Sequence, residues 1–262
     1  MPCCPTCHVP RPPAAERPLD LLAIGAHPDD VDISCGGTLA LAAAQGYAVG
    51  ILDLTRGEMG TNGTPEMRAA EAAEAARLLG AAGRWNAGLP DGGIRSGEPD
   101  QERCVVELLR RLRPAILLTH YPQDRHPDHV QASLISERAW YLAGLARYAA
   151  DGAPFRPSAR FHFALRVGFH PTLVVDVTEQ WETKRLAMLA HKSQVTQEVP
   201  GAAPTQLNQP DFLERVEARM RHYGGMIGVR YGEPYYSDAP MGARSLAPIF
   251  GAPKPVPGAF TG

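Results

Sequence analysis

Two short blocks of the sequence hold histidine and aspartate at spacings that suit a catalytic metal. They are His27-Pro-Asp-Asp30 and His126-Pro-Asp-His129. Catalytic zinc typically takes three protein ligands from histidine and carboxylate and keeps one position for water. His27 and Asp30 lie on one tight turn fixed by a proline, so both can face one ion, and His129 is the best candidate for the third ligand. The blocks therefore predict a site for zinc or another divalent metal.

The other polar residues of these blocks suit amide hydrolysis. Asp29 adjoins a ligand without being needed as one, which places it well to act as a general base. His126, before His129 in the second block, can meet the substrate from the other side. One His-Pro-Asp tripeptide alone is usually only a turn. Two of them, each extended by a further Asp or His, indicate a working site.

The elements that must position these residues alternate along the chain. Short, nearly apolar runs at 19–26, 48–54 and 115–119 are typical of buried parallel strands. Thr64 and Pro65 form an N-cap and first position that begin a helix running to residue 79. Alternating strands and helices predict an α/β, Rossmann-like three-layer sandwich with a mainly parallel sheet. Further helices are expected at 36–45, 100–112, 128–145, 179–192 and 210–223, and further strands near 85 and at 160–167 and 173–177.

This arrangement locates the chemistry. In open parallel sheets, ligands bind beyond the carboxyl ends of the strands. Residues 27–30, 55–64 and 120–129 each follow a predicted strand, so three loops converge on one edge of the sheet. His120, His162 and His222 stand apart from the two blocks and are interpreted as structural or solvated.

Longer blocks carry a family resemblance. Together with the two histidine blocks, they resemble the LmbE-like (PIG-L) zinc N-deacetylases, and most closely the bacillithiol-biosynthesis deacetylases. The likeness covers roughly residues 19 to 240 and is highly specific when the blocks are taken together. The blocks are Ala26-His-Pro-Asp-Asp30, Asp53-Leu-Thr-Arg-Gly-Glu-Met-Gly60, Gly63-Thr-Pro-Glu-Met-Arg68, Asn86-Ala-Gly-Leu-Pro-Asp-Gly92, Tyr121-Pro-Gln-Asp-Arg-His-Pro-Asp-His129 and Gly168-Phe-His170.

The resemblance implies a role for each site residue. Asp29 would activate the zinc water and later return a proton to the amine. His126, oriented by Asp128, would be the cation that stabilises the tetrahedral oxyanion. Arg68 would hold the substrate from the start of the facing helix. The zinc ligands that it implies are His27, Asp30 and His129.

The implied substrate is a small-molecule N-acetylglucosamine conjugate, with GlcNAc-malate the leading candidate. Relatives also suggest a homo-oligomer such as a hexamer. Two departures bear on the substrate: Phe212 stands where relatives usually carry an oxyanion-binding Tyr, and His191-Lys-Ser-Gln194 stands where they usually read Tyr-x-Ser-Gln. Either a nearby tyrosine compensates or the site depends more on His126. The candidate tyrosines are Tyr231, Tyr235 and Tyr236.

Other functions remain in view. The enzyme could act on another N-acetyl sugar conjugate. A non-catalytic Rossmann-type ligand binder is disfavoured by Asp29, because a binder has no need of a base beside a metal. A redox or metal carrier would use the cysteine tail, but the sequence lacks a second cysteine pair. The cysteines of that tail, interpreted as part of a non-functional extension, are Cys3, Cys4 and Cys7.

Bulk properties fit one globular enzyme. The chain has 262 residues, 44% of them hydrophobic, and a net charge of −2. We expect a single domain at residues 19–250, a tail at 1–18 and an irregular tail at 251–262. The charge shows no footprint for nucleic acid or an acidic membrane, and no apolar run approaches the ~18 residues of a membrane span. No secretory signal precedes the domain, so a cytoplasmic location is expected.

Overall fold

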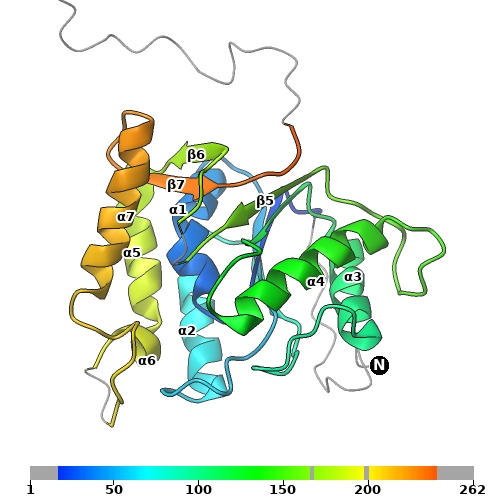
Figure 1. Ribbon diagram of the computed structural model, residues 1–262, viewed down its shortest axis with the longest axis horizontal. Coiled ribbons are helices and arrows are strands. Elements are labelled where there is room, and N and C mark those ends of the chain that lie inside the picture. Colours follow the sequence, from blue (N-terminus) through cyan, green and yellow to red (C-terminus); the bar gives the residue numbers. More distant parts are fainter. Residues whose placement is uncertain (1–16, 166–167, 198–200, 241–262) are drawn as a thin grey trace, which may run out of the picture.

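A five-stranded parallel sheet forms the centre of the molecule (Figure 1). The computed structural model describes residues 17–165, 168–197 and 201–240. The strand order is β3-β2-β1-β4-β5, and each neighbouring pair is parallel. These strands are β1 (Leu21–Gly25), β2 (Val49–Asp53), β3 (Gly83–Asn86), β4 (Ile116–His120) and β5 (Ala159–Phe163).

Helices cover both faces of this sheet. Helices α3 (Pro99–Leu112) and α4 (Pro127–Ala143) pack on one face through one apolar cluster. Helices α1 (Asp30–Ala44), α2 (Pro65–Leu78) and α5 (Trp181–Ala190) pack on the other face through a second cluster (Figure 1). Thr64 caps α2 by accepting a hydrogen bond from the Met67 amide, as its sequence predicts. The predicted α/β three-layer sandwich is confirmed.

A second, two-stranded sheet departs from the prediction. Strand β6 (Leu173–Asp176) was expected among the parallel strands, but it pairs antiparallel with β7 (Gly232–Tyr235). One antiparallel bridge between His162 and Tyr236 connects this pair to the central sheet. Helix α7 (Phe212–Met226) packs against this pair of strands. Two short elements lie between β6 and α7 in the chain, the 3-10 helix Thr178–Gln180 and helix α6 (Lys192–Val195).

Helix α1 begins before its expected start at Gly36 and contains a kink. Cys35 has a non-helical backbone (φ −133°, ψ 15°), so the amides of the next turn lack helical partners. The Glu233 carboxylate accepts hydrogen bonds from the amides of Gly37 (2.9 Å) and Thr38 (2.7 Å). It also binds the Lys184 ammonium at 2.5 Å. We refer to the buried set Thr38, Lys184, Glu233 and Tyr235 as the Lys184–Glu233 cluster.

Among the described residues, no helix is both long enough and apolar enough to span a bilayer. Cys3, Cys4 and Cys7 and the tail at 251–262 lie outside the described residues. Cys35 and Cys104 are free and buried. The expected domain limits remain a prediction.

Candidate metal centre and active-site cavity

A strained turn after β1 presents the first block. The His27 amide donates a hydrogen bond to Asp30 Oδ2 at 2.8 Å, which closes the turn. Asp29 is the N-cap of α1 and has φ 154°, a backbone conformation that residues other than glycine rarely adopt. The turn therefore directs two neighbouring carboxylates differently, because Asp30 turns back to His27 while Asp29 faces Arg68.

Three buried side chains form a group that suits a metal. The ligand atoms of His27, Asp30 and His129 all lie within 4.8 Å of one another. Asp30 Oδ2 is 3.3 Å from His27 Nδ1, and Asp30 Oδ1 is 3.3 Å from His129 Nε2. Two imidazoles and one carboxylate are a donor set that catalytic zinc takes in proteins. We call these three residues the metal group; the structure brings them together as the sequence predicted.

Further carboxylates surround the metal group. Asp91 Oδ1 and Asp128 Oδ2 lie 3.1 Å and 3.4 Å from His27 Nε2, and Asp124 Oδ2 lies 3.2 Å from His129 Nδ1. Asp91 and Asp124 were not predicted, although both fall inside quoted blocks that follow strands of the central sheet. The structure also shows that the ligand atoms of His27, His126 and Asp128 lie within 4.8 Å of one another.

These carboxylates control the charge of the two imidazoles. Burial lowers the pKa of His27, but hydrogen bonds to Asp128, Asp30 and Asp91 outweigh it and hold the pKa well above its ordinary value. Burial likewise opposes the protonation of His129, yet Asp30 and Asp124 raise its pKa to about 9. The metal group thus demands positive charge. Protons supply it at neutral pH, and a divalent cation bound to the same atoms would replace them.

His120 belongs to the same site, although it stands apart from the two blocks in the sequence. It is buried, its Nε2 accepts the Ala26 amide at 3.0 Å, and that nitrogen is 3.3 Å from Asp30 Oδ2. Its ring stacks on His129 with centroids 4.4 Å apart. Burial and the neighbouring His129 lower its pKa to about 4. Its position in the sequence could have indicated this role. His120 is the last residue of β4, and the carboxyl ends of the parallel strands form the edge of the sheet where the site lies.

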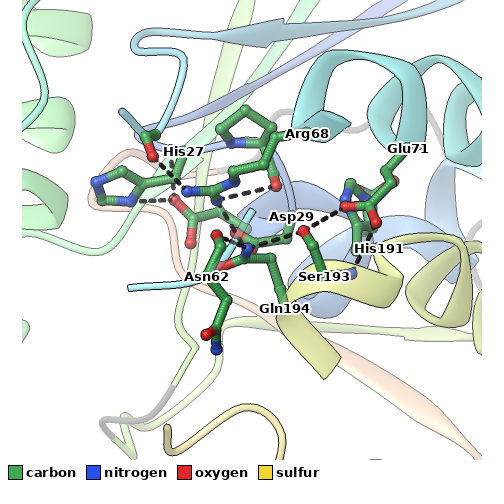
Figure 2. A network of polar contacts seen from close by, with 12 residues as sticks. His27, Asp29, Asn62, Arg68, Glu71, His191, Ser193 and Gln194 are labelled. Carbon is green, nitrogen blue, oxygen red and sulfur yellow. Dashed lines mark hydrogen bonds and ion pairs between the residues drawn. The ribbon is translucent and has the colours of Figure 1, made fainter. Parts of the chain in front are cut away.

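Asp29 and Arg68 form a buried pair outside the metal group (Figure 2). Arg68 Nη2 is 3.5 Å from Asp29 Oδ2, and Arg68 also donates to the carbonyls of Gly57 (2.8 Å) and Pro28 (3.3 Å). A Cβ on Gly57 would meet Arg68 Nη1 at 1.9 Å, so the guanidinium requires glycine there. Burial raises the pKa of Asp29, and Arg68 opposes that rise. A buried carboxylate with a raised pKa suits a general base.

The predicted pair of His126 and Asp128 is connected in another way than expected. The Asp128 carboxylate accepts the Gly92 amide at 2.7 Å and faces His27. The Asp128 amide donates to His126 Nδ1 at 3.2 Å, so Asp128 orients His126 through its backbone. Burial, followed by the charges of His129 and His27, lowers the pKa of His126. A neutral His126 with Nδ1 as acceptor carries its proton on Nε2 and is a hydrogen-bond donor.

A cavity of about 380 Å³, which we call the first cavity, contains the metal group, Asp29, Arg68 and His126. None of the tyrosines considered as replacements for Phe212 lines it within the described part of the chain. Tyr231 donates to Glu217, Tyr235 donates to Thr38, and Tyr236 lies against Tyr121. The residues that line this cavity are His27, Asp29, Asp30, Ile33, Met59, Gly60, Arg68, Asp91, Gly92, Asp124, Arg125, His126, His129, Leu165, Gln194 and Leu207.

The His191-Lys-Ser-Gln194 segment supports one wall of this cavity (Figure 2). Gln194 Nε2 donates to the Asn62 carbonyl at 2.7 Å, and Ser193 donates to Glu71 of α2 through both its amide and its hydroxyl. His191 Nε2 lies 3.0 Å from Asp32 Oδ2 in the first turn of α1. The segment therefore ties α6 to α2, to the loop that contains Asn62 and to the start of α1.

Known proteins are similar to this chain in sequence and in fold. The family model of PIG-L, described as GlcNAc-PI de-N-acetylase, matches residues 22–140, which contain both histidine blocks. A 1D-myo-inositol 2-acetamido-2-deoxy-alpha-D-glucopyranoside deacetylase of Nocardia farcinica is 29% identical over 79% of this chain and 92% of its own. The crystal structure of the conserved protein TT1542 from Thermus thermophilus is 41% identical, with a TM-score of 0.80 over 87% of this chain and 99% of its own.

Two more distant structures show the fold alone, each at 24% identity. One is the N,N'-diacetylchitobiose deacetylase of Pyrococcus horikoshii, with a TM-score of 0.70 over 82% of each chain. The other is GalB, the 4-carboxy-2-hydroxymuconate hydratase of Pseudomonas putida KT2440, with a TM-score of 0.72 over 87% of this chain and 99% of its own. The fold thus carries more than one reaction, so the reaction must be argued from sequence relatives and from the site. Full-length likeness to TT1542, the family match across both blocks and the deacetylase relatives lead to one conclusion: the chain belongs to the PIG-L (LmbE-like) family and is a hydrolytic N-deacetylase.

Proposed function

We propose that this enzyme removes the N-acetyl group from an N-acetylglucosamine conjugate, using a divalent metal, with zinc the first choice, held by His27, Asp30 and His129. One observation carries the proposal: a buried metal group lies beside a second buried carboxylate, Asp29, that does not belong to it. A metal-binding protein without catalysis has no need of that carboxylate. Amide hydrolysis needs both a Lewis acid and a base.

The residues divide the reaction between them. A divalent ion in the metal group would supply Lewis acidity that polarises the acetyl carbonyl and acidifies water. Asp29 would take a proton from the attacking water and return it to the departing amine. Its burial favours both steps, because a raised pKa makes the carboxylate a stronger base in the first step and leaves it able to hold the proton for the second. Arg68, anchored by its bonds to the backbone, would hold Asp29 in place and would also contact the substrate, as the resemblance implies.

His126 would stabilise the oxyanion that develops during the reaction. The family resemblance implies a cation here. The lowered pKa instead favours a neutral imidazole that donates from Nε2, and a divalent ion nearby would lower the pKa in the same direction. A donor fixed by the Asp128 amide needs little reorganisation as negative charge appears.

We make separate proposals for the aglycone of the substrate, the cellular location and the oligomeric state. The bacillithiol-like blocks favour malate, whereas the Nocardia relative is named for an inositol conjugate. We retain GlcNAc-malate as the proposed substrate. We also propose that the enzyme acts in the cytoplasm as a homo-oligomer such as a hexamer.

Amine release tests the reaction directly. Purified protein should release amine from N-acetylglucosamine conjugates in a panel that includes the malate, inositol and methyl conjugates. Chelation should abolish release and added zinc should restore it. Release that survives complete metal removal would contradict the proposed mechanism, and no release from any conjugate would contradict the proposed substrate class.

A further inference from the structure

A second cavity adjoins the first. It has a volume of about 360 Å³, and the two cavities share Ile33, Arg125, Leu165 and Leu207. A ligand that places its acetamide at the metal group can therefore extend across this shared wall. Five residues line the second cavity but not the first, and most of them belong to α7: Gln206, Phe212, Arg215, Val216 and Arg219.

The floor of the second cavity is apolar. Ile33, Leu165, Phe212 and Val216 are buried and belong to one hydrophobic cluster between α1, α5 and α7. Phe212, the residue that departs from the family pattern, lies in this floor and leaves the first cavity without an aromatic hydroxyl from α7. An apolar floor suits the carbon skeleton of a ligand rather than a fully hydroxylated ring.

The rim of the second cavity is cationic. Arg125, Arg215 and Arg219 line it, and its described lining includes no carboxylate. Arg215 does bind Asp211 Oδ1 at 3.2 Å, but both side chains are more than half exposed, so this ion pair is weak. Arg219 Nη1 donates to the Ala164 carbonyl at 3.4 Å, which holds its guanidinium at the cavity. Three guanidinium groups in a chain of net charge −2 are a concentrated site for an anion.

The charges of the two cavities set a direction for the ligand. The first cavity mixes the carboxylates Asp29, Asp30, Asp91 and Asp124 with Arg68, Arg125 and three histidines, so it offers an anionic group no uniformly cationic surface. The second cavity favours the same group. A conjugate with an anion at one end is thus attracted to bind with its acetamide at the metal group and its anion at α7.

We propose that the second cavity is the aglycone subsite of this enzyme, and that Arg215 and Arg219 select an aglycone with a short carbon skeleton and a carboxylate or phosphate. This inference rests on the proposed function, because the acetamide is placed by the metal group. It assigns specificity to α7, which contributes no residue to the metal group.

Binding of deacetylated products tests this subsite without requiring turnover. We would titrate the protein calorimetrically with three glucosamine products: the methyl glycoside, whose aglycone is uncharged, the malate glycoside and the glycoside of 2-hydroxyethyl phosphate. At least one anionic product should bind about tenfold more tightly than the methyl glycoside, the size expected when charged hydrogen bonds form. The double variant Arg215→Gln, Arg219→Gln should lose that preference, and the single variant Arg215→Gln should lose part of it.

A matched control lies on the same helix. Arg221→Gln removes an exposed arginine of α7 that pairs with Glu217 and does not line the cavity, so its preference for the anion should equal that of the wild type. A stronger preference for malate assigns a carboxylate, and a stronger preference for phosphate assigns that anion. Equal binding of the methyl and both anionic products, or a preference retained by the folded double variant, would overturn the subsite. A preference for the anionic products without any amine release from the acetylated conjugates would contradict only the proposed reaction.

Discussion

Two buried charge clusters lie along α1, and they differ in how their charges balance. At the start of the helix, four carboxylates contact the two imidazoles of His27 and His129. At the kink, one carboxylate, Glu233, meets one ammonium, Lys184, and two backbone amides. The first cluster requires added positive charge, whereas the second is complete within the protein.

This difference distinguishes a cluster that is suited to bind a ligand from a cluster that only stabilises the fold. In the Lys184–Glu233 cluster, Glu233 caps the helical segment that follows the kink, and the Tyr235 hydroxyl donates to Thr38 at 2.6 Å. These bonds fix α1 against β7, and the ion pair between Lys184 and Glu233 ties β7 to α5. The metal group instead holds its imidazoles beside excess carboxylate, a costly arrangement that a bound cation relieves. Charge balance therefore indicates which buried cluster awaits a ligand.

Breaking the balanced cluster should produce the largest loss of stability. Lys184→Met leaves Glu233 buried without its ammonium partner, which should lower the free energy of unfolding by about 3–5 kcal/mol. Chemical denaturation would measure this loss. Metal content per folded chain should stay near that of the wild type. A variant as stable as the wild type would show that this cluster is not the support described above.

His126→Ala should affect turnover and leave the metal in place. Removing one oxyanion donor typically costs about 10²–10³-fold in kcat, so we expect a fall of that size. The matched control is His222→Ala, since His222 is exposed on α7. If His126→Ala loses its metal, the alternative group of His27, His126 and Asp128 is the ligand set instead.

The pH response should distinguish the metal-free from the metal-loaded protein. The pKa of His27 is raised well above its ordinary value and that of His129 to about 9. In metal-free protein, protonated imidazoles thus stabilise the fold at neutral pH, and this contribution is lost as the pH rises through about 9. Zinc binding near pH 7 should release protons, and its affinity should rise with pH.

Calorimetric titration of zinc in two buffers of different ionisation enthalpy would measure that proton release. The His222→Ala control should release as many protons as the wild type. Zinc binding with no proton release, or an affinity that does not change with pH around neutrality, would contradict the charge state assigned to the two imidazoles.

The central sheet could be predicted because its signals are local. Strands β1, β2 and β4 are short, largely apolar runs, and the dipeptide Thr64-Pro65 marks the start of α2. Strand β7 could not be predicted in this way. Its sequence contains Gly232 and Pro234, which are poor strand residues, and it forms because β6 lies beside it. The kink in α1 depends likewise on Glu233, far away in the sequence.

The residues of the site also differ in whether the sequence alone could predict them. The metal group and Asp29 lie in two compact blocks that follow strands, so spacing was enough to propose them. Asp91 and Asp124 were within reach of the same argument. His120 was wrongly interpreted as structural or solvated because it stands outside a block. Arg215 and Arg219 gave no signal, since their significance depends on how α7 packs against Ile33 and Leu165 in three dimensions.

Metal content and turnover, measured together on Asp29→Asn and Asp30→Asn, test the central claim most directly. The two substitutions are chemically identical and lie at neighbouring residues of one turn. Asp30→Asn should lose both zinc and activity, because Asp30 contacts both imidazoles of the metal group. Asp29→Asn should keep about one zinc per chain while kcat falls by about 10²–10⁴-fold, the usual contribution of a general base. Loss of zinc from Asp29→Asn with retention in Asp30→Asn would reverse the two roles and contradict the account.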